Sequence, residues 1–397
     1  MIISGTTLGA GMFSIPVVTA GVWFTGSIVL LLYTWVCMYI SGLMILEVNI
    51  NYPIGASFHT MVDDLLGKKW NLLNNISITF VLYILTYAYI ISAGQSMITH
   101  TLESYLNIKQ ATVSLTCAVI VAYIIWRLTH IVDLLNTILI SGMIITFLLS
   151  TVDMFINVNT LILFNTNDTQ AQYLPYTLVA LPYLLTSFGY HSNIPGLVRY
   201  YNKNAQLVAL SLLIGTLIAL IIYIFWQYVI QGNISRTTFQ QIIAEGGNIG
   251  SLLKQVNKVS HNIIITKLLK AFSYMALTSS FLGVSLGLFD FISDYFKLNN
   301  TDNGRKKAIL ITFLPPTLGA IIFPNSFLYA IGFAGLAATI WTVIVPAMMV
   351  RASRKRFSTT IYKVPGGSIM ILFIIFFGLI NIITYILSLF NVLPIYK

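Results

Sequence analysis

The sequence consists largely of uninterrupted apolar runs, each about as long as the helix that crosses a bilayer. A spanning helix needs roughly 20 mostly apolar residues. Only 8% of the residues are charged, against about 25% in a soluble domain, and so few charges could not cover a water-exposed surface. The sequence therefore predicts an all-α polytopic membrane protein with eleven transmembrane helices, at 2–22, 26–46, 72–98, 112–126, 134–152, 174–198, 206–230, 271–289, 308–323, 327–350 and 367–389.

The basic residues indicate how these spans are oriented. Fourteen of the 21 Lys and Arg residues fall in loops on one side of the predicted membrane, and cytoplasmic loops are the ones enriched in these residues. This predicts a cytoplasmic N-terminus and a C-terminus on the outer side. The net charge of +10 is spread over short loops between apolar runs and forms no single patch. The sequence therefore predicts the lipid bilayer as a partner and no nucleic acid.

Two of the apolar runs are interrupted by glycine and proline in a similar way. The first contains the stretch from Gly9 to Pro16, and the sixth contains the stretch from Gly189 to Pro195. Proline removes a donor from the helical ladder and glycine disfavours the helix, so both stretches are expected to unwind. Unwound backbone is tolerated at membrane depth only where it lines a cavity or is buried in protein. The alternative interpretation is a pair of ordinary kinks or packing notches.

The spacing of the two interruptions favours the unwound interpretation. Five spans separate them, so the first and sixth helices run in opposite directions across the bilayer. Matched breaks in halves of opposite topology are typical of inverted-repeat transporters. The sequence thus predicts a first repeat at 1–152, a second at 173–350 and an extra helix at 364–397. Free amides near Gly9 and Gly11 are expected to meet a substrate carboxylate, and exposed carbonyls an amino group or cation.

Four segments resemble the hydroxy/aromatic amino acid permease family of the amino acid–polyamine–organocation superfamily. They are 5–12 (GTTLGAGM), 186–191 (TSFGYH), 280–290 (SFLGVSLGLFD) and 312–316 (TFLPP), and the similarity runs through essentially the whole chain. It is closest to the tyrosine-specific members, with the tryptophan permeases as the nearest alternative. The resemblance implies a five-plus-five inverted repeat of the leucine-transporter type plus one helix, with helices 1 and 6 broken. It also implies proton-driven uptake across a bacterial inner membrane.

Together, the breaks and the resemblance predict a set of substrate-binding residues. Tyr87 joins this set because Tyr83, Tyr87 and Gln95 fall on one helix face that could border an aromatic ring, although packing against neighbouring helices would explain them equally. The predicted set is Thr7, Gly9, Ala10, Gly11, Met12, Tyr87, Ser187, Phe188, Gly189, Tyr190 and His191.

Candidates for coupling to an ion come from polar residues inside the spans, which are costly there and often functional. His191 could carry a proton or bind substrate, or be an ordinary hydrogen-bonded histidine. Thr278 and Ser279 could ligate sodium, or bond across helices. Glu47 is a further candidate, although it and Asp290 lie near cytoplasmic helix ends, where structural pairing is the alternative. Protons are favoured over sodium because of the resemblance.

Two features depart from the family pattern. Family members usually carry a lysine in the fifth helix at the position of Met143, so a charge partner for the first break is absent here. Only eight residues precede Gly9, which at helical rise reaches about 12 Å, less than half a bilayer. We therefore expect the true start of the protein to lie upstream of Met1.

No motif in the sequence supports catalysis. It contains no phosphate-binding loop, no metal-spaced His/Cys/Asp cluster and no carboxylate pair within one span, so no enzyme activity, metal or cofactor is predicted. Cys37 and Cys117 lie in apolar runs and are expected to be small core residues. Two alternatives of another class stay open, a non-transporting amino acid sensor on the same fold and a membrane-embedded enzyme.

Overall fold

The computed structural model describes residues 7, 9, 11–97, 110–166, 168, 170–259, 263–298, 301–357 and 362–396. Within these residues every regular element is a helix, as the sequence predicts. The long elements are α3 (Trp23–Ile50), α5 (Lys68–Met97), α6 (Gln110–Arg127), α7 (Thr129–Ile156), α11 (Ala205–Asn233), α14 (Ile263–Tyr295), α15 (Asp302–Ile322) and α18 (Gly367–Leu389).

Three of the predicted spans are divided into shorter pieces. The first is represented by Thr7, Gly9 and α2 (Gly11–Val18), and the sixth by η2 (Leu174–Tyr176), α9 (Thr177–Ser187), η3 (His191–Asn193) and α10 (Ile194–Tyr200). The tenth is α16 (Phe327–Thr339), the π-helical turn η4 (Ile340–Ile344) and α17 (Val345–Arg356). Breaks in the first and sixth spans were predicted, whereas the π turn was not.

Eight helices in the described part of the chain are long and apolar enough to cross a membrane. They are α3, α5, α6, α7, α11, α14, the continuous α16–α17 segment and α18. The broken first and sixth spans fall below the length of a single spanning helix, and α15 begins with a charged turn. The protein is therefore a multi-span membrane protein, and the count of eleven spans stays a prediction.

Four shorter helices lie between the spans. They are α4 (Phe58–Leu66), α8 (Thr160–Leu163), α12 (Thr238–Ala244) and α13 (Ile249–Val259). The strongly amphipathic pattern of α13, with Leu252, Leu253 and Val256 buried and Lys254 and Lys258 on its polar side, suits a helix at the membrane boundary. None of the four was predicted, because they lack a long apolar run.

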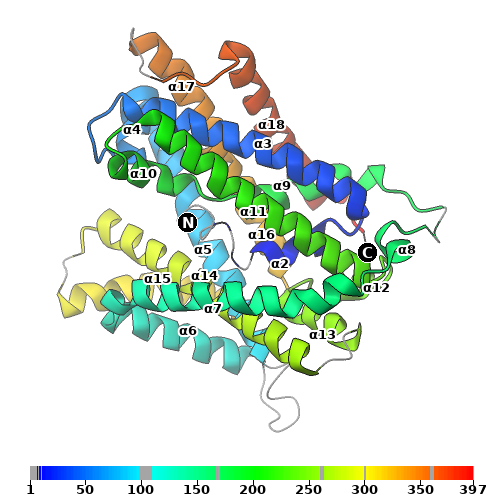
Figure 1. The fold of residues 1–397 in the computed structure, drawn as a ribbon. Helices are drawn as coiled ribbons and strands as arrows, with labels where there is room; N and C mark the ends of the chain where they lie inside the picture. Colours follow the sequence, from blue (N-terminus) through cyan, green and yellow to red (C-terminus); the bar gives the residue numbers. More distant parts are fainter. Residues whose placement is uncertain are drawn as a thin grey trace.

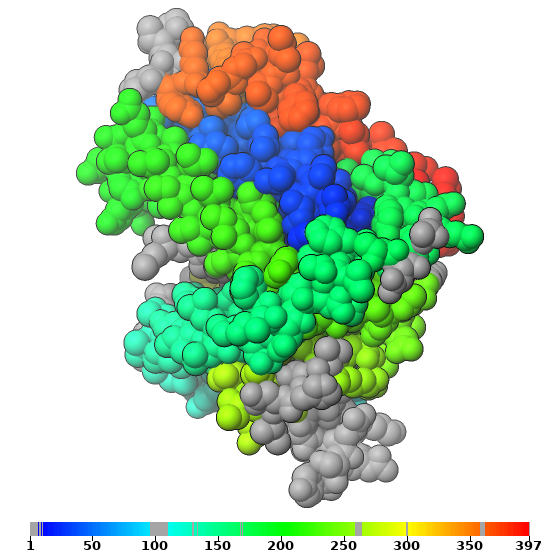
Figure 2. Space-filling model, turned by 45° about the vertical axis from the view of Figure 1, so that its right-hand side comes forward, coloured from blue at the N-terminus to red at the C-terminus, as the bar shows by residue number. Residues whose placement is uncertain are grey.

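The long helices form two layers that meet around the first broken helix. Figure 1 shows α3 and α11 side by side in one layer, and α6, α7, α14 and α15 in the other, with α2 between them. The helix α5 packs against α14, α15 and α16 and so links both layers. Figure 2 shows the layers meeting on one face, where α11 (green) runs above α7 (teal).

Side chains from other helices compensate for prolines inside two spans. Pro315 cannot donate to the carbonyl of Ile311, and the Tyr83 hydroxyl on α5 donates to that carbonyl instead, at 2.8 Å. Pro346 likewise leaves the carbonyl of Thr342 without its helical donor, and the Ser41 hydroxyl on α3 donates to it. Without water in the bilayer core, such donors are what allow a proline-containing helix to persist.

Candidate functional site

The first break is defined by its backbone hydrogen bonds. The amide of Gly9 donates to the carbonyl of Thr7 at 3.0 Å, and the amide of Met12 donates to Gly9 at 3.1 Å. These bonds span two and three residues, whereas the α-helix bonds four residues apart. Thr7 is helical and regular helix resumes at Gly11, so the backbone at Gly9 departs from the helix between them.

The second break repeats this pattern. The amide of Tyr190 donates to Phe188 at 3.1 Å, and the amide of Asn193 donates to Tyr190 at 3.0 Å. The spans of two and then three residues are the same as at Thr7, Gly9 and Met12. Helix resumes at Ile194, with Pro195 in its first turn, where a missing amide costs nothing.

The ends of the two half-helices meet. The amides of the first turn of α2 point toward the break, which gives that end a partial positive charge. The helix α9 ends at Ser187, and its last carbonyls, which lack donors from the helix itself, give that end a partial negative charge. A Cβ placed on Gly11 would lie 3.9 Å from Cα and Oγ of Ser187, so the ends are adjacent. This geometry suits a small zwitterion that carries one charge of each sign.

Tyr223 on α11 contacts both breaks. Its hydroxyl oxygen lies 2.5 Å from the carbonyl oxygen of Thr7 and 2.7 Å from that of Ser187. The Tyr223 side chain is fully buried, and its ring packs edge-on against Phe188 with 5.3 Å between centroids. A single phenol therefore holds the two unwound segments at a fixed separation.

The layer opposite contributes Ser280 and Tyr89. A Cβ at Gly9 would lie 2.5 Å from Oγ of Ser280 on α14, so the backbone of the first break and this hydroxyl approach closely. Ser280 is hydrogen-bonded to the buried Tyr89 on α5, which lies near Tyr223 and packs against Phe281 at 6.4 Å. Both layers thus supply hydroxyls and aromatic rings to one place.

His191 and Tyr190 lie on another side of the sixth break. Their rings stack at 4.6 Å, and the His191 ring meets Trp341 of the π turn edge-on at 6.3 Å. The Tyr190 hydroxyl donates to the carbonyl of Met38 on α3 at 3.0 Å. His191 is fully buried, and neither ring nitrogen has a hydrogen-bond partner of good geometry in the described part of the chain.

The remaining residues predicted at the breaks are placed as follows. Met12 and Phe188 are buried, and Gly189 is so close to the carbonyl of Thr186 that a Cβ would lie 3.2 Å from it. Ala10 lies outside the described residues. On α14, Thr278 is exposed and Ser279 half-buried, whereas their neighbour Ser280 is the hydroxyl that reaches Gly9.

Two predicted site residues lie away from the breaks. The Tyr87 hydroxyl donates to the carbonyl of Phe323 at 2.8 Å, and its ring lies beside Gly319 on α15. The face that carries Tyr83, Tyr87 and Gln95 therefore joins α5 to α15 and α16, and Tyr89 is the α5 tyrosine near the breaks. Glu47 is fully buried at the far end of α3, where Arg354 binds both carboxylate oxygens at 2.6 and 2.8 Å.

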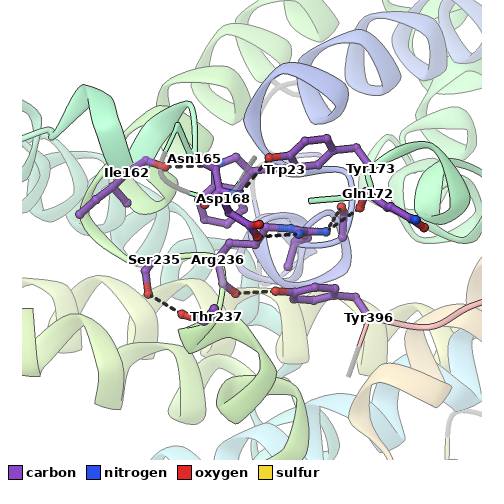
Figure 3. Close-up of polar contacts among 12 residues, drawn as sticks. Trp23, Ile162, Asn165, Asp168, Gln172, Tyr173, Ser235, Arg236, Thr237 and Tyr396 are labelled. Carbon is purple, nitrogen blue, oxygen red and sulfur yellow. Dashed lines mark hydrogen bonds and ion pairs between the residues drawn. The ribbon is translucent and has the colours of Figure 1, made fainter. Parts of the chain in front are cut away.

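A buried arginine fixes the far end of α2. Figure 3 shows Arg236, which follows α11, among residues of several loops. Its guanidinium donates to the carbonyls of Ala20 at 3.3 Å and of Gly21 and Gln172 at 2.8 Å, and Asp168 lies 3.9 Å away. These carbonyls follow α2 and precede η2, so the arginine joins the segment after the first broken span to the segment before the sixth.

Aromatic rings complete the surroundings of Arg236. Its guanidinium carbon lies 4.5 Å from the ring centroid of Tyr396 and 4.8 Å from that of Tyr173. The Tyr396 hydroxyl donates to the Arg236 carbonyl at 3.2 Å. Burial raises the pKa of Tyr396, and the positive charge of Arg236 acts in the opposite direction. The segment that carries Tyr396 is thereby attached, through Arg236, to the segment that follows α2.

Comparison with known proteins decides the family. The model of the tryptophan/tyrosine permease family matches residues 1–385. The chain belongs to this family of membrane permeases. It is 49% identical to the tryptophan-specific transport protein of Pseudomonas aeruginosa, over 100% of this chain and 95% of that protein. It is 50% identical to that of Haemophilus influenzae, over 97% and 94%, and 40% identical to the tyrosine permease of Enterobacter agglomerans, over 99% and 96%.

The family assignment confirms the predicted resemblance and the absence of an enzyme activity, since these relatives are permeases and transport proteins. Among solved structures, the permease superposes on a variant of the manganese transporter of Eremococcus coleocola with a TM-score of 0.64. The match covers 99% of this chain and 87% of that one at 10% identity. At that identity the likeness shows a shared transporter fold alone.

Sequence reasoning missed Tyr223, Ser280 and Tyr89. Each lies in an otherwise apolar run, and nothing in the local pattern distinguishes Tyr223 from Tyr228 or Tyr89 from Tyr87. One signal was available for Ser280, because it opens the segment SFLGVSLGLFD that carries part of the family resemblance.

Proposed function

We propose that this permease imports an aromatic amino acid across the bacterial inner membrane, with tryptophan as the first candidate and tyrosine as the second. The observation that carries the proposal is the junction of α2 and α9, where two half-helix ends of opposite polarity meet beside aromatic rings. The sequence analysis put tyrosine first. The order is reversed here because the tryptophan-specific relatives from two organisms share 49% and 50% identity with the full chain, against 40% for a tyrosine permease.

The main-chain groups at this junction suit the two charges of an amino acid. We assign the carboxylate to the amides at the start of α2, near Gly11, since helix N-termini favour anions. We assign the ammonium to the carbonyl end of α9 at Ser187. The aromatic side chain of the substrate would then lie toward Phe188 and Tyr89, whose rings offer edge and face contacts.

An inverted repeat of five plus five spans, 1–152 and 173–350, followed by the helix within 364–397, is part of this proposal. The packing of the described helices supports it. The helix α7 packs on α14, which is a contact between the fifth and eighth predicted spans. The helix α16 packs on α5, which is a contact between the tenth and third predicted spans. The contacts α6 to α14 and α15 to α5 correspond in the same way. Replacing each span by the one five positions away in the other repeat, the fifth by the tenth and the eighth by the third, turns each pair into its counterpart, which an inverted repeat requires.

We further propose that uptake is coupled to protons, with the N-terminus in the cytoplasm and the C-terminus in the periplasm. His191 supports coupling to protons, because it is a titratable side chain within a break and is buried against Tyr190 and Trp341. Glu47, in contrast, is fully engaged with Arg354. Sodium is the second candidate, with ligands among the first-break carbonyls and the hydroxyls of Thr278, Ser279 or Ser280.

Uptake of labelled tryptophan into proteoliposomes tests this function. An imposed pH gradient without sodium should drive accumulation, and unlabelled tryptophan, tyrosine and phenylalanine should compete in a panel of the twenty amino acids. Accumulation of leucine or serine with no competition by aromatic amino acids would overturn the substrate class. Tryptophan binding without accumulation under either a proton or a sodium gradient would instead indicate a sensor.

A further inference from the structure

The hydroxyl of Tyr223 contacts a carbonyl in each of the two breaks, but it has only one proton to donate. Tyr223 lies 2.5 Å from the carbonyl oxygen of Thr7 and 2.7 Å from that of Ser187, and both contacts are within hydrogen-bond distance. A phenol carries one proton and so can donate to one carbonyl at a time. At any moment one of the two carbonyls faces only a lone pair of the Tyr223 oxygen.

The two carbonyls differ in what else they can bind. The Thr7 carbonyl also accepts the amide of Gly9 at 3.0 Å, and it is the nearer of the two to the phenol. Ser187 is the last residue of α9, so its carbonyl is one of the four that lack a donor from the helix itself. When the phenol proton is on Thr7, the Ser187 carbonyl is an open acceptor at the negative end of a helix dipole.

We propose that Tyr223 is the positioning residue that makes the permease select for the substrate's α-ammonium group. It holds the Thr7 and Ser187 carbonyls at one separation and supplies a proton to only one, so the other is left to accept an N–H from the substrate. This inference rests on the proposed amino acid site between α2 and α9. An anionic analogue with the same ring and carboxylate but no amino group leaves that acceptor buried and unpaired, which is costly.

The neighbours of Tyr223 keep its hydroxyl in this place. The ring packs edge-on against Phe188, and the side chain is fully buried. On the other layer, Tyr89 is engaged with Ser280 and lies near the Tyr223 hydroxyl. Because the ring contacts do not involve the hydroxyl, Tyr223→Phe removes the proton and the oxygen while the packing stays in place. Tyr228→Phe, on the same helix with its ring against Phe24 and Phe155, is the matched control.

The test compares two competitors of labelled tryptophan uptake, unlabelled tryptophan and indole-3-propionate, which lacks only the amino group. The wild-type permease should bind tryptophan much more tightly than indole-3-propionate. In Tyr223→Phe the phenol no longer holds the two carbonyls at one separation, so the Ser187 carbonyl is not kept in place for the ammonium. The affinity for tryptophan should fall about tenfold or more, the loss expected for the hydrogen bond between the ammonium and that carbonyl, while the affinity for indole-3-propionate stays within about twofold. Tyr228→Phe should leave the ratio of the two affinities unchanged.

A second variant keeps the test decisive if Tyr223→Phe does not reach the membrane. Incorporation of 4-aminophenylalanine at position 223 places an amino group with two protons where the hydroxyl lies, so it can donate to both carbonyls and leave none for the ammonium, and it should reduce the same ratio. Equal losses for both competitors, or an unchanged ratio in both variants, would refute the role of Tyr223 while tryptophan uptake by the wild type stands. A wild-type permease that takes up no aromatic amino acid would refute the proposed function itself.

Discussion

Glu47 on α3 and Arg354 on α17 form a two-point ion pair, with the guanidinium nitrogens 2.6 and 2.8 Å from the two carboxylate oxygens. The amide of Val364 also donates to the carboxylate at 2.7 Å, so Glu47 fastens the segment before α18 as well. Glu47 is fully buried, whereas one fifth of the Arg354 side chain is exposed. The pair therefore joins three segments, and the carboxylate depends on its partners more than the guanidinium does.

The first prediction concerns this asymmetry. Arg354→Gln should lower the free energy of unfolding by about 3–5 kcal/mol, because it leaves a buried carboxylate without its cation. Glu47→Gln should cost less, since Arg354 can still reach water. Thermal unfolding of the purified variants in detergent measures both. Asp302→Asn, in an exposed pair with Lys306, is the control and should have little effect. A Glu47→Gln protein of normal stability that has lost ion coupling would favour the ion-coupling role.

A second prediction separates the two glycines of the first break. Gly9→Ala places a methyl 2.5 Å from Oγ of Ser280, which must move away from its bond to Tyr89. Uptake should fall at least tenfold, which corresponds to an increase of about 1.4 kcal/mol in the activation free energy of transport. Gly11→Ala meets only ordinary contacts at 3.9 Å from Ser187 and leaves the residue 11 amide in place, so it should keep most activity.

The double variant Gly9→Ala with Ser280→Ala decides whether this contact is the cause. Removing Oγ leaves the nearest atom of residue 280 at 3.7 Å from the new methyl, an ordinary separation. The double variant should therefore regain uptake relative to Gly9→Ala alone. If both lose uptake equally, the glycine is required for its backbone and not for its lack of a side chain.

Arg236 supplies the third prediction. Arg236→Lys keeps the charge but cannot reach the carbonyls of Ala20, Gly21 and Gln172 together, because an ammonium lacks the planar fork. The loss of one or two hydrogen bonds from a charged group should destabilise the protein by about 2–4 kcal/mol. Thermal unfolding would measure this, and uptake should decrease in parallel. Lys254→Gln, which breaks an exposed pair with Glu245, should change neither.

The fourth prediction concerns acid. The Tyr52 hydroxyl donates to Asp64 on α4 at 2.6 Å, and Arg356 on α17 lies 2.8 Å from the carboxylate. Both contacts lower the pKa of Asp64, and the hydrogen bond from Tyr52 has the larger effect. A lowered pKa stabilises the folded protein above the ordinary carboxyl value of about 3.9, and this contribution is lost as the pH falls through the folded value. The stability difference between wild type and Asp64→Asn should be constant near neutrality and shrink below about pH 4. A difference that grows on acidification would contradict this sign.

The fifth prediction tests proton coupling. His191→Ala should weaken uptake driven by a pH gradient far more than Ser192→Ala does, since His191 is buried in the break and its neighbour Ser192 is exposed. The expected loss is at least tenfold in gradient-driven uptake, with substrate exchange between two tryptophan pools largely kept, because exchange needs no net proton movement. Equal effects of the two variants, or uptake that collapses in sodium-free buffer, would transfer the role to a sodium site.

Much of the fold could be predicted because the apolar runs and the Gly-Pro interruptions are local signals. Helix bounds were less accessible, since several helices continue past the apolar run into polar turns. The predicted span 271–289 became α14 (Ile263–Tyr295), which includes Lys267 and Lys270, and 308–323 became α15 from Asp302. In the second case the Thr301 side chain accepts the Gly304 amide and so caps the helix start.

The candidate site was predictable only where it consists of backbone. The breaks could be located because glycine and proline act on the chain itself. Which tyrosine faces the breaks depends on how each helix is rotated and on packing between distant segments. A spacing of four residues in the sequence predicts neither of these. The stripe with Tyr87 was read correctly as one face of α5. That face meets α15, however, and the Tyr87 hydroxyl donates a hydrogen bond to the carbonyl of Phe323.

The attachment of Tyr396 to Arg236 has a practical consequence for how this permease is studied. A purification tag or fluorescent reporter is commonly fused to the last residue of a membrane protein. Here Tyr396 lies on the guanidinium that also binds the carbonyls following α2. A bulky group fused directly after this segment would act on that contact and slow transport without touching the substrate.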